Sequence, residues 1–92
     1  MIEKRVTVTN RLGLHARAAA RLVQMANRFQ SAMRLERVDD QGTADAKSIL
    51  SVLMLAAAHG TELSAKAEGA DEAEAIAALA ELFSNGFGEA EK

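Results

Sequence analysis

The side chain best placed for chemistry in this sequence is a histidine between a glycine-containing turn and a segment of helical periodicity. His15 comes two residues after Gly13, and Arg17 comes two residues after His15. The first N–H groups of a helix have no intrahelical partner, and the helix dipole adds about half a positive charge at that end. A negatively charged group on the His15 imidazole would therefore be stabilised there.

A phosphoryl group is one anion that this position could stabilise. With His15 at or next to the N-cap, the ring nitrogen Nδ1 is expected to lie over the first helical amides. A phosphoryl group on Nδ1 could then accept hydrogen bonds from the N–H groups of Ala16 and Arg17, and the Arg17 guanidinium could add a charge-assisted bond. The dipole also disfavours the imidazolium and so favours a neutral nucleophile. The alternative interpretation is that His15 only caps the helix and Arg17 is a solvated side chain.

A serine stands before the second segment of helical periodicity. Ser48 is placed as an N-cap residue, and that structural role alone explains a serine at this position. The segment after it is apolar on more than one helical face, so part of it is expected to stay exposed and to contact a partner protein. The alternative is that the core takes all of it. The apolar residues are Ile49, Leu50, Val52, Leu53, Met54 and Leu55.

The sequence indicates no metal and no cofactor. His59 precedes Gly60 and is predicted to bind the last carbonyls of the second helix. A metal shared by His15 and His59 is not expected, because the chain has no cysteine and no carboxylates at a matching spacing. Glycine loops for phosphates, dinucleotide fingerprints and paired carboxylates are also missing from the sequence.

Alternating and helical periodicities predict the elements that must position these residues. Alternation predicts a strand over residues 2–10, a hairpin whose arms lie at 32–38 and near 43–44, and a strand over 62–68. Helical spacing predicts helices over 16–28, from Ser48 to about residue 59, and up to about Ser84. Asp71 and Glu74 have the spacing of a capping box for the last helix.

The predicted order β-α-β-β-α-β-α indicates an α+β fold. Helices on one face of a small antiparallel sheet fit this order, as in an open-faced sandwich of a four-stranded sheet with three helices. Residues 1–88 are expected to form a single domain, and the acidic residues 89–92 are expected to fray. Periodicity alone does not give the order of the strands in the sheet.

Composition limits the classes of function. The 92 residues are 49% apolar and 26% charged, which is typical of one globular domain without room for a deep active site. A net charge of -2 and an aromatic fraction of 3% argue against nucleic acid as a partner. The lack of cysteine, and of any run of about 18 apolar residues, predicts a cytoplasmic protein that does not insert into membranes.

Two strings of residues resemble the signatures of a known family. The first is Leu12-Gly13-Leu14-His15-Ala16-Arg17-Ala18-Ala19, which resembles the active-site signature of HPr, the histidine-containing phosphocarrier of the bacterial phosphotransferase system. The second, Ala46-Lys47-Ser48-Ile49, resembles that family's other signature, and the length and element order are also similar. Ala18 departs from the family, which commonly has proline there, and the hairpin over 37–43 is about two residues longer. The ending at 82–87 is similar to the nitrogen-related branch.

The resemblance implies roles for particular residues. His15 would accept a phosphoryl group on Nδ1 from Enzyme I and pass it to a histidine of an EIIA-type protein, with Arg17 binding the phosphate. Ile49, Leu50 and Leu53 would dock on these partners, with Arg21 at the rim. In many bacteria the serine that matches Ser48 is phosphorylated by an HPr kinase, so Ser48 is a candidate regulatory site.

Other classes of function stay open at this point. The chain could be a regulatory, nitrogen-related phosphorelay module that controls target proteins without sugar uptake. A small histidine-dependent phosphatase is a further alternative, but the motif offers no general acid. The favoured interpretation is a monomeric phosphocarrier that serves as a protein substrate and is not itself an enzyme.

Overall fold

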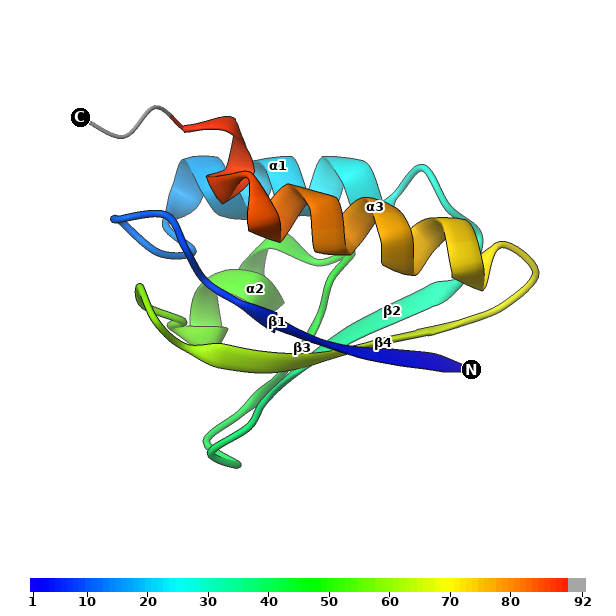
Figure 1. The fold of residues 1–92 in the computed structure, drawn as a ribbon, viewed down its shortest axis with the longest axis horizontal. Helices are drawn as coiled ribbons and strands as arrows, with labels where there is room; N and C mark the ends of the chain where they lie inside the picture. Colours follow the sequence, from blue (N-terminus) through cyan, green and yellow to red (C-terminus); the bar gives the residue numbers. More distant parts are fainter. Residues whose placement is uncertain (90–92) are drawn as a thin grey trace.

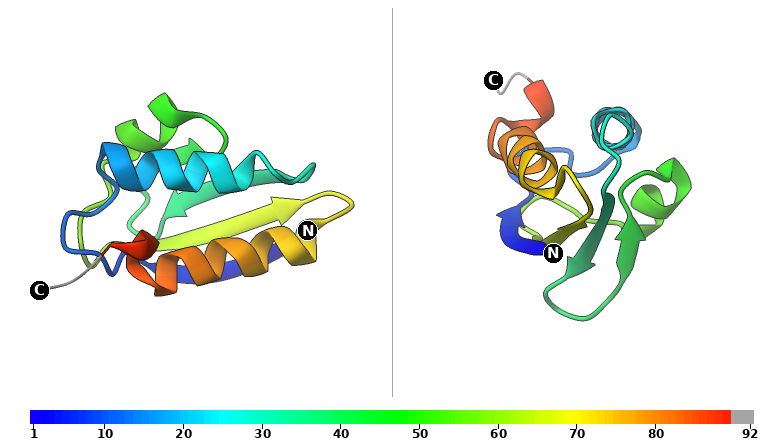
Figure 2. Two further views of the ribbon diagram at one scale, coloured as in Figure 1. Left: turned by 90° about the horizontal axis from the view of Figure 1, so that it is seen from above. Right: turned by 90° about the vertical axis from the view of Figure 1, so that its right-hand side faces the viewer.

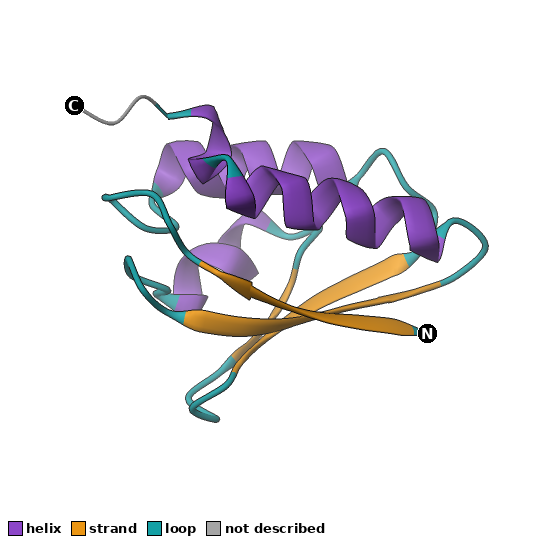
Figure 3. Ribbon diagram, in the orientation of Figure 1, coloured by secondary structure: helices purple, strands orange, loops and turns teal. Residues whose placement is uncertain are grey.

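The computed structural model describes residues 1–89 and has the predicted order of elements. These residues form four strands and three helices, followed by a short 3-10 turn; Figures 1 and 3 show their arrangement. Their bounds are β1 (Ile2–Thr7), α1 (Ala16–Ala26), β2 (Ala32–Arg37), β3 (Thr43–Asp45), α2 (Ile49–Leu55), β4 (Glu62–Glu68), α3 (Glu72–Ser84) and η1 (Gly86–Gly88).

The four strands form one antiparallel sheet in the order β1-β4-β2-β3. Strand β4 is central, and its Leu63 lies opposite Val6 of β1 and Arg37 of β2. All three helices cover the same face of the sheet, as the end-on view in Figure 2 shows. The predicted open-faced sandwich is therefore confirmed.

The core lies between the sheet and the helices. Helix α1 contributes buried alanines to the core, and its Leu22 is fully buried. Phe83 at the end of α3 packs edge-on against Phe87, with ring centroids 4.8 Å apart. The largest fully buried side chains are Phe83, Phe87, Leu22, Met33, Leu35, Leu63 and Leu79. Both phenylalanines therefore tie the C-terminal segment to the core.

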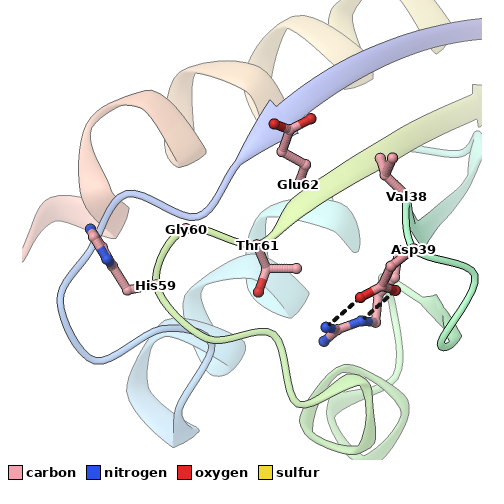
Figure 4. Close-up of a pocket in the computed structure, with 7 residues that line it drawn as sticks. Val38, Asp39, His59, Gly60, Thr61 and Glu62 are labelled. Carbon is pink, nitrogen blue, oxygen red and sulfur yellow. Dashed lines mark hydrogen bonds and ion pairs between the residues drawn. The ribbon is translucent and has the colours of Figure 1, made fainter.

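Helix α2 is shorter than the sequence predicts. It ends at Leu55, because Ala56 takes the left-handed conformation with φ 54°. Arg37 of β2 donates from Nη1 to the carbonyls of Leu55 and Ala56, at 3.2 and 3.3 Å. The predicted capping role of His59 is therefore wrong. Figure 4 shows His59 in the loop before Gly60, away from the Arg37–Asp39 ion pair.

Helix α3 begins without the predicted capping box. Asp71 makes no side-chain cap, and its carboxylate instead accepts bonds from the backbone N–H groups of Gln30 and Ser31, both at 2.9 Å. Glu72 accepts a bond from Gly69 N–H at 3.0 Å. A capping box is a local pattern, whereas Asp71 is held by a turn that is distant in sequence. The prediction for Asp71 and Glu74 is therefore wrong.

Candidate functional site

The loop between β1 and α1 is fixed on both sides of Gly13. Gly13 has φ +71°, and a Cβ atom there would lie 2.7 Å from the carbonyl oxygen of Ala57. The next residue, Leu14, donates from its N–H to that same carbonyl at 2.9 Å. Asn10, which is fully buried, donates from Nδ2 to the carbonyl of Gly13 at 2.7 Å. These contacts determine where His15 enters the helix.

His15 is the N-cap of α1, as the sequence predicts. Its backbone is extended, with φ -76° and ψ -178°, while its carbonyl accepts the first helical bond from Ala19 N–H at 2.8 Å. Nδ1 of the ring faces the helix end and accepts a bond from the N–H of Arg17 at 3.3 Å. Nδ1 therefore lies at the positive end of the helix dipole.

The other ring nitrogen has a carboxylate partner. Nε2 of His15 lies 2.6 Å from Oε2 of Glu89, while Oε1 of Glu89 accepts a bond from Asn10 Nδ2 at 3.0 Å. Since Glu89 accepts, Nε2 carries the proton, and the lone pair stands on Nδ1. The ring is 30% exposed and the Glu89 side chain 12%. The result is a histidine whose nucleophilic atom is Nδ1.

Glu89, the first residue of the tail that was expected to fray, makes hydrogen bonds to Asn10 and His15. Helix α3 ends at Ser84, and beyond it Phe87 is buried with φ 61°, which turns the chain back toward α1. Arg21 donates from Nη1 to the carbonyl of Phe87 and so ties the segment to α1. Figure 1 shows this C-terminal segment, in red, above the start of α1. Residues 90–92 of the expected tail lie outside the described residues.

The surroundings of Glu89 favour its ionised form. Burial is the largest single influence and raises the pKa of Glu89. The hydrogen bonds from Asn10 and His15, with the charges of His15 and Arg21, together outweigh burial and hold that pKa below its usual value. The ionised carboxylate of Glu89 therefore lies next to Nε2 of His15 at neutral pH.

The two arginines of α1 near the site have different surroundings. Arg17 is exposed, and its guanidinium forms no ion pair within residues 1–89. Arg21 is exposed as a residue, yet its guanidinium bonds the carbonyl of Phe87. Of these two arginines, Arg17 is therefore the one whose guanidinium has no ion-pair partner among residues 1–89.

Helix α2 lies beside the His15 end of α1, as the left view of Figure 2 shows. Its N-cap is Ser48, whose Oγ accepts a bond from Ser51 N–H at 3.2 Å, as predicted. Part of the apolar run is exposed, which confirms that the core does not take all of it. The exposed fractions are 42% for Ile49, 65% for Leu50, 38% for Leu53 and 75% for Met54.

The described part of the chain offers no metal centre. Within residues 1–89, no group of three His, Asp or Glu side chains is arranged to hold a metal ion. None of the helices in this part is long and apolar enough to cross a membrane.

An open-faced sandwich with a histidine at the N-cap of α1, and Nδ1 of its ring at the first turn, fits a phosphocarrier protein. The chain belongs to the HPr family: the family described as "PTS HPr component phosphorylation site" matches residues 2–85. HPr proteins are phosphocarriers of the phosphotransferase system, and this chain is one of them.

Individual relatives match along almost the whole chain. The chain is 46% identical over 91 residues to the phosphocarrier protein HPr of Cupriavidus necator, covering 99% of this chain and 100% of that one. It is 48% identical over 86 residues to that of Pseudomonas aeruginosa, covering 94% of each. Among solved structures, HPr-C-His from Thermoanaerobacter tengcongensis matches with a TM-score of 0.92 and 41% identity, covering 99% of this chain and 100% of that one.

Sequence analysis missed two residues of the site, Asn10 and Glu89. Asn10 stands where a strand gives way to a turn, and an asparagine there is ordinary turn chemistry. Glu89 follows a glycine that ends a helix and lies in an acidic stretch. The available signal was Phe87, since a phenylalanine after the end of a helix tends to bury its ring and turn the chain back toward the core.

Proposed function

We propose that this phosphocarrier accepts its phosphoryl group on Nδ1 of His15 from Enzyme I and passes it to a histidine of an EIIA-type protein. One observation carries the proposal: Nδ1 lies at the first turn of α1, where it accepts a bond from Arg17 N–H. The lone pair needed for attack is on that atom because Nε2 faces a carboxylate. Membership of the HPr family supports phosphoryl transfer, and the geometry of the helix end supports Nδ1 of His15 as the atom that accepts the group.

The helix end suits the phosphorylated form as well. Once Nδ1 is bonded to phosphorus, its lone pair no longer accepts the Arg17 N–H, which becomes free to donate to a phosphoryl oxygen. The N–H of Ala16 lies in the same first turn and has no intrahelical partner. The guanidinium of Arg17 adds a charge-assisted bond. These donors favour the phosphoryl group without enclosing it, so a partner can still remove it.

The exposed apolar side chains of α2 are proposed as the docking surface for both partners. Ile49, Leu50 and Leu53, together called the docking patch, are all exposed on a helix that lies beside α1. Apolar side chains left uncovered on a small protein favour a protein partner. Arg21 stands at the rim in this proposal, although its guanidinium already bonds Phe87.

Ser48 is proposed as a regulatory site next to the docking patch. A phosphoryl group on its Oγ, added by an HPr kinase, would place up to two negative charges at the start of α2. That charge would repel any anionic partner surface that approaches His15 and the docking patch. Phosphorylation of Ser48 would therefore weaken docking without touching His15 itself.

Incubation with Enzyme I and phosphoenolpyruvate, followed by mass measurement of the intact protein, tests the proposal. The wild type should gain one phosphoryl group that is acid-labile and base-stable, and His15→Ala should gain none. Equal phosphorylation of His15→Ala would reject the assignment. A regulatory phosphorelay would use the same site, so supplying sugar-specific and regulatory EIIA proteins as acceptors separates these two alternatives.

A further inference from the structure

The contact between the C-terminal segment and the His15 ring is held by several hydrogen bonds. Both carboxylate oxygens of Glu89 are engaged, one by Nε2 of His15 at 2.6 Å and the other by Nδ2 of Asn10 at 3.0 Å. Asn10 also holds the carbonyl of Gly13, so a single buried amide joins Glu89 to the loop that places His15. Glu89 thus lies in a fixed position relative to the imidazole.

Further contacts hold the residues that precede Glu89. Phe87 is 1% exposed and packs on Phe83, and its carbonyl is bonded by Arg21 of α1. Asn85 accepts a bond from Gly88 N–H at 3.1 Å. The short turn of η1 is therefore fixed by the core on one side and by α1 on the other. This anchoring brings the Glu89 carboxylate to the His15 ring.

We propose that Glu89 is a positioning residue for phosphoryl transfer, which keeps the proton on Nε2 of His15 both before and after Nδ1 is phosphorylated. The inference rests on the proposed phosphorylation of Nδ1 and adds a role for a residue outside the two signature strings. The geometry resembles a carboxylate that orients a catalytic imidazole and stabilises its charged form.

The chemistry of both transfer steps gives this proton its importance. In loading, the Nδ1 lone pair forms a bond to phosphorus, and the donor's bond to phosphorus breaks with its electron pair staying on the donor. The ring then carries a positive charge shared with the Nε2 proton, and the Glu89 carboxylate stabilises that charge. In unloading, the acceptor attacks phosphorus and the Nδ1 electron pair returns to the ring. Because Nε2 keeps its proton, the leaving group is neutral imidazole and not an imidazolate anion.

Few charged groups compete with Glu89 around the ring. Arg17 and Arg21 come from α1, Arg11 belongs to the loop that leads into His15, and His59 lies in the loop after α2. Helix α2 adds none, because its sequence ILSVLML has no titratable side chain. The arginines are cations and would favour loss of the Nε2 proton. Glu89, the carboxylate bonded to the ring among residues 1–89, opposes them.

The test compares wild type, Glu89→Gln and Glu74→Gln after phosphorylation by Enzyme I and phosphoenolpyruvate. Glu74 is an exposed residue in the first turn of α3, so the control removes the same charge away from the ring. Nitrogen NMR follows the Nε2 proton of the phosphorylated ring against pH, and rapid-quench assays follow transfer to an EIIA-type acceptor. Melting curves confirm that all variants are folded.

Glu89→Gln should lower the midpoint for loss of the Nε2 proton by about one pH unit, which is the effect of one hydrogen bond to a charged group. Transfer at a pH above the new midpoint should slow about tenfold, while Glu74→Gln should match the wild type. Glu89→Asp, which keeps the charge, should lose the Nε2 proton at a midpoint close to that of the wild type. An unchanged midpoint in folded Glu89→Gln would overturn the inference, whereas a wild type not phosphorylated on His15 would overturn the proposed function beneath it.

Discussion

At His15 the two ring nitrogens have different partners, and this difference leaves the lone pair on Nδ1. Nδ1 accepts an N–H bond from the start of α1, while Nε2 faces the Glu89 carboxylate. Neither partner encloses the ring, which remains 30% exposed. The local chemistry of a helix end therefore serves in place of a deep pocket, as the short chain requires. A group on Nδ1 stays accessible to a second protein.

Arg17→Ala tests the phosphate-binding role of the guanidinium. We expect transfer from Enzyme I to slow by about tenfold or more, because a charge-assisted donor to the phosphoryl group is lost. The free energy of unfolding should change by no more than about 0.5 kcal/mol, as for other exposed side chains without partners. Arg28→Ala, near the other end of α1, is the control for the lost charge. Transfer at the same rate in both variants would reject the role of Arg17.

At the scale of elements, the sequence predicted where helices begin better than where they end. His15 and Ser48 were recognisable as caps because each stands directly before a helical pattern, and the structure has both as N-caps. The end of α2 was not predictable, because its last carbonyls are bonded by Arg37, which is 18 residues away from Leu55. A helix cap can be recognised from the local sequence, whereas a helix end fixed by a tertiary contact leaves no pattern in the local sequence.

Asp71 and Glu89 illustrate the same limit for single side chains. Asp71 has the spacing of a capping residue, yet it bonds the turn at Ser31, which is 40 residues earlier. Glu89 meets His15 across 74 positions of sequence. A carboxylate can satisfy its bonding locally or across the fold, and only the packing of the elements decides between them. The histidine at the N-cap of α1 was predictable, and its distant partner Glu89 was not.

Ser48→Asp separates the capping role of this residue from its place beside the docking patch. Aspartate is itself a good N-cap, so the free energy of unfolding should change by no more than about 0.5 kcal/mol. The added negative charge at the start of α2 should slow transfer from Enzyme I, and more at low salt than at high salt, because salt screens charge effects on docking. The measurement is transfer rate against salt concentration, with melting curves.

Gln41→Glu is the matched control, since it adds one negative charge in the exposed hairpin turn. It should transfer as the wild type does. If Ser48→Asp also transferred like the wild type at low salt, with melting unchanged, Ser48 would be a helix cap outside the docking surface.

At the scale of the whole molecule, one carboxylate joins two turns at the end of the sandwich away from His15. Asp71, before α3, accepts bonds from the Ser31 hydroxyl and from two backbone N–H groups of the turn before β2. The Ser31 hydroxyl, followed by Gln30 N–H, lowers the pKa of Asp71 below its usual value. A carboxyl group with a lowered pKa stabilises the fold above its unfolded-state pKa, and this contribution is lost as pH falls through the folded-state value.

Asp71→Asn should therefore be less stable than the wild type at neutral pH, and the difference should shrink as the pH falls into the acid range. Urea unfolding at a series of pH values from 7 to about 3 measures this difference. Asp40→Asn, in the exposed hairpin turn, provides a control for the same chemical change. A stability difference for Asp71→Asn that stayed constant with pH would show that ionisation of Asp71 does not matter to the fold.

The architecture itself was predictable from periodicity, because each strand alternates and each helix has an apolar stripe. The strand order β1-β4-β2-β3 was not, since alternation says which face is buried but not which strand lies alongside. That order makes β4 central and leaves β1 at one edge, directly before the loop that carries His15. The site is thus held by long-range pairing although its signature is local.

The most direct test of the central claim is phosphorus and nitrogen NMR of the protein after phosphorylation by Enzyme I and phosphoenolpyruvate. The bonding at the start of α1 predicts a single phosphoryl group, on Nδ1 of His15, with Nε2 still protonated at neutral pH. Coupling of phosphorus to Nδ1 would be the expected result. A phosphoryl group on Nε2 of His15, or on His59 or any other residue, would contradict the claim that the helix end selects Nδ1 as the acceptor.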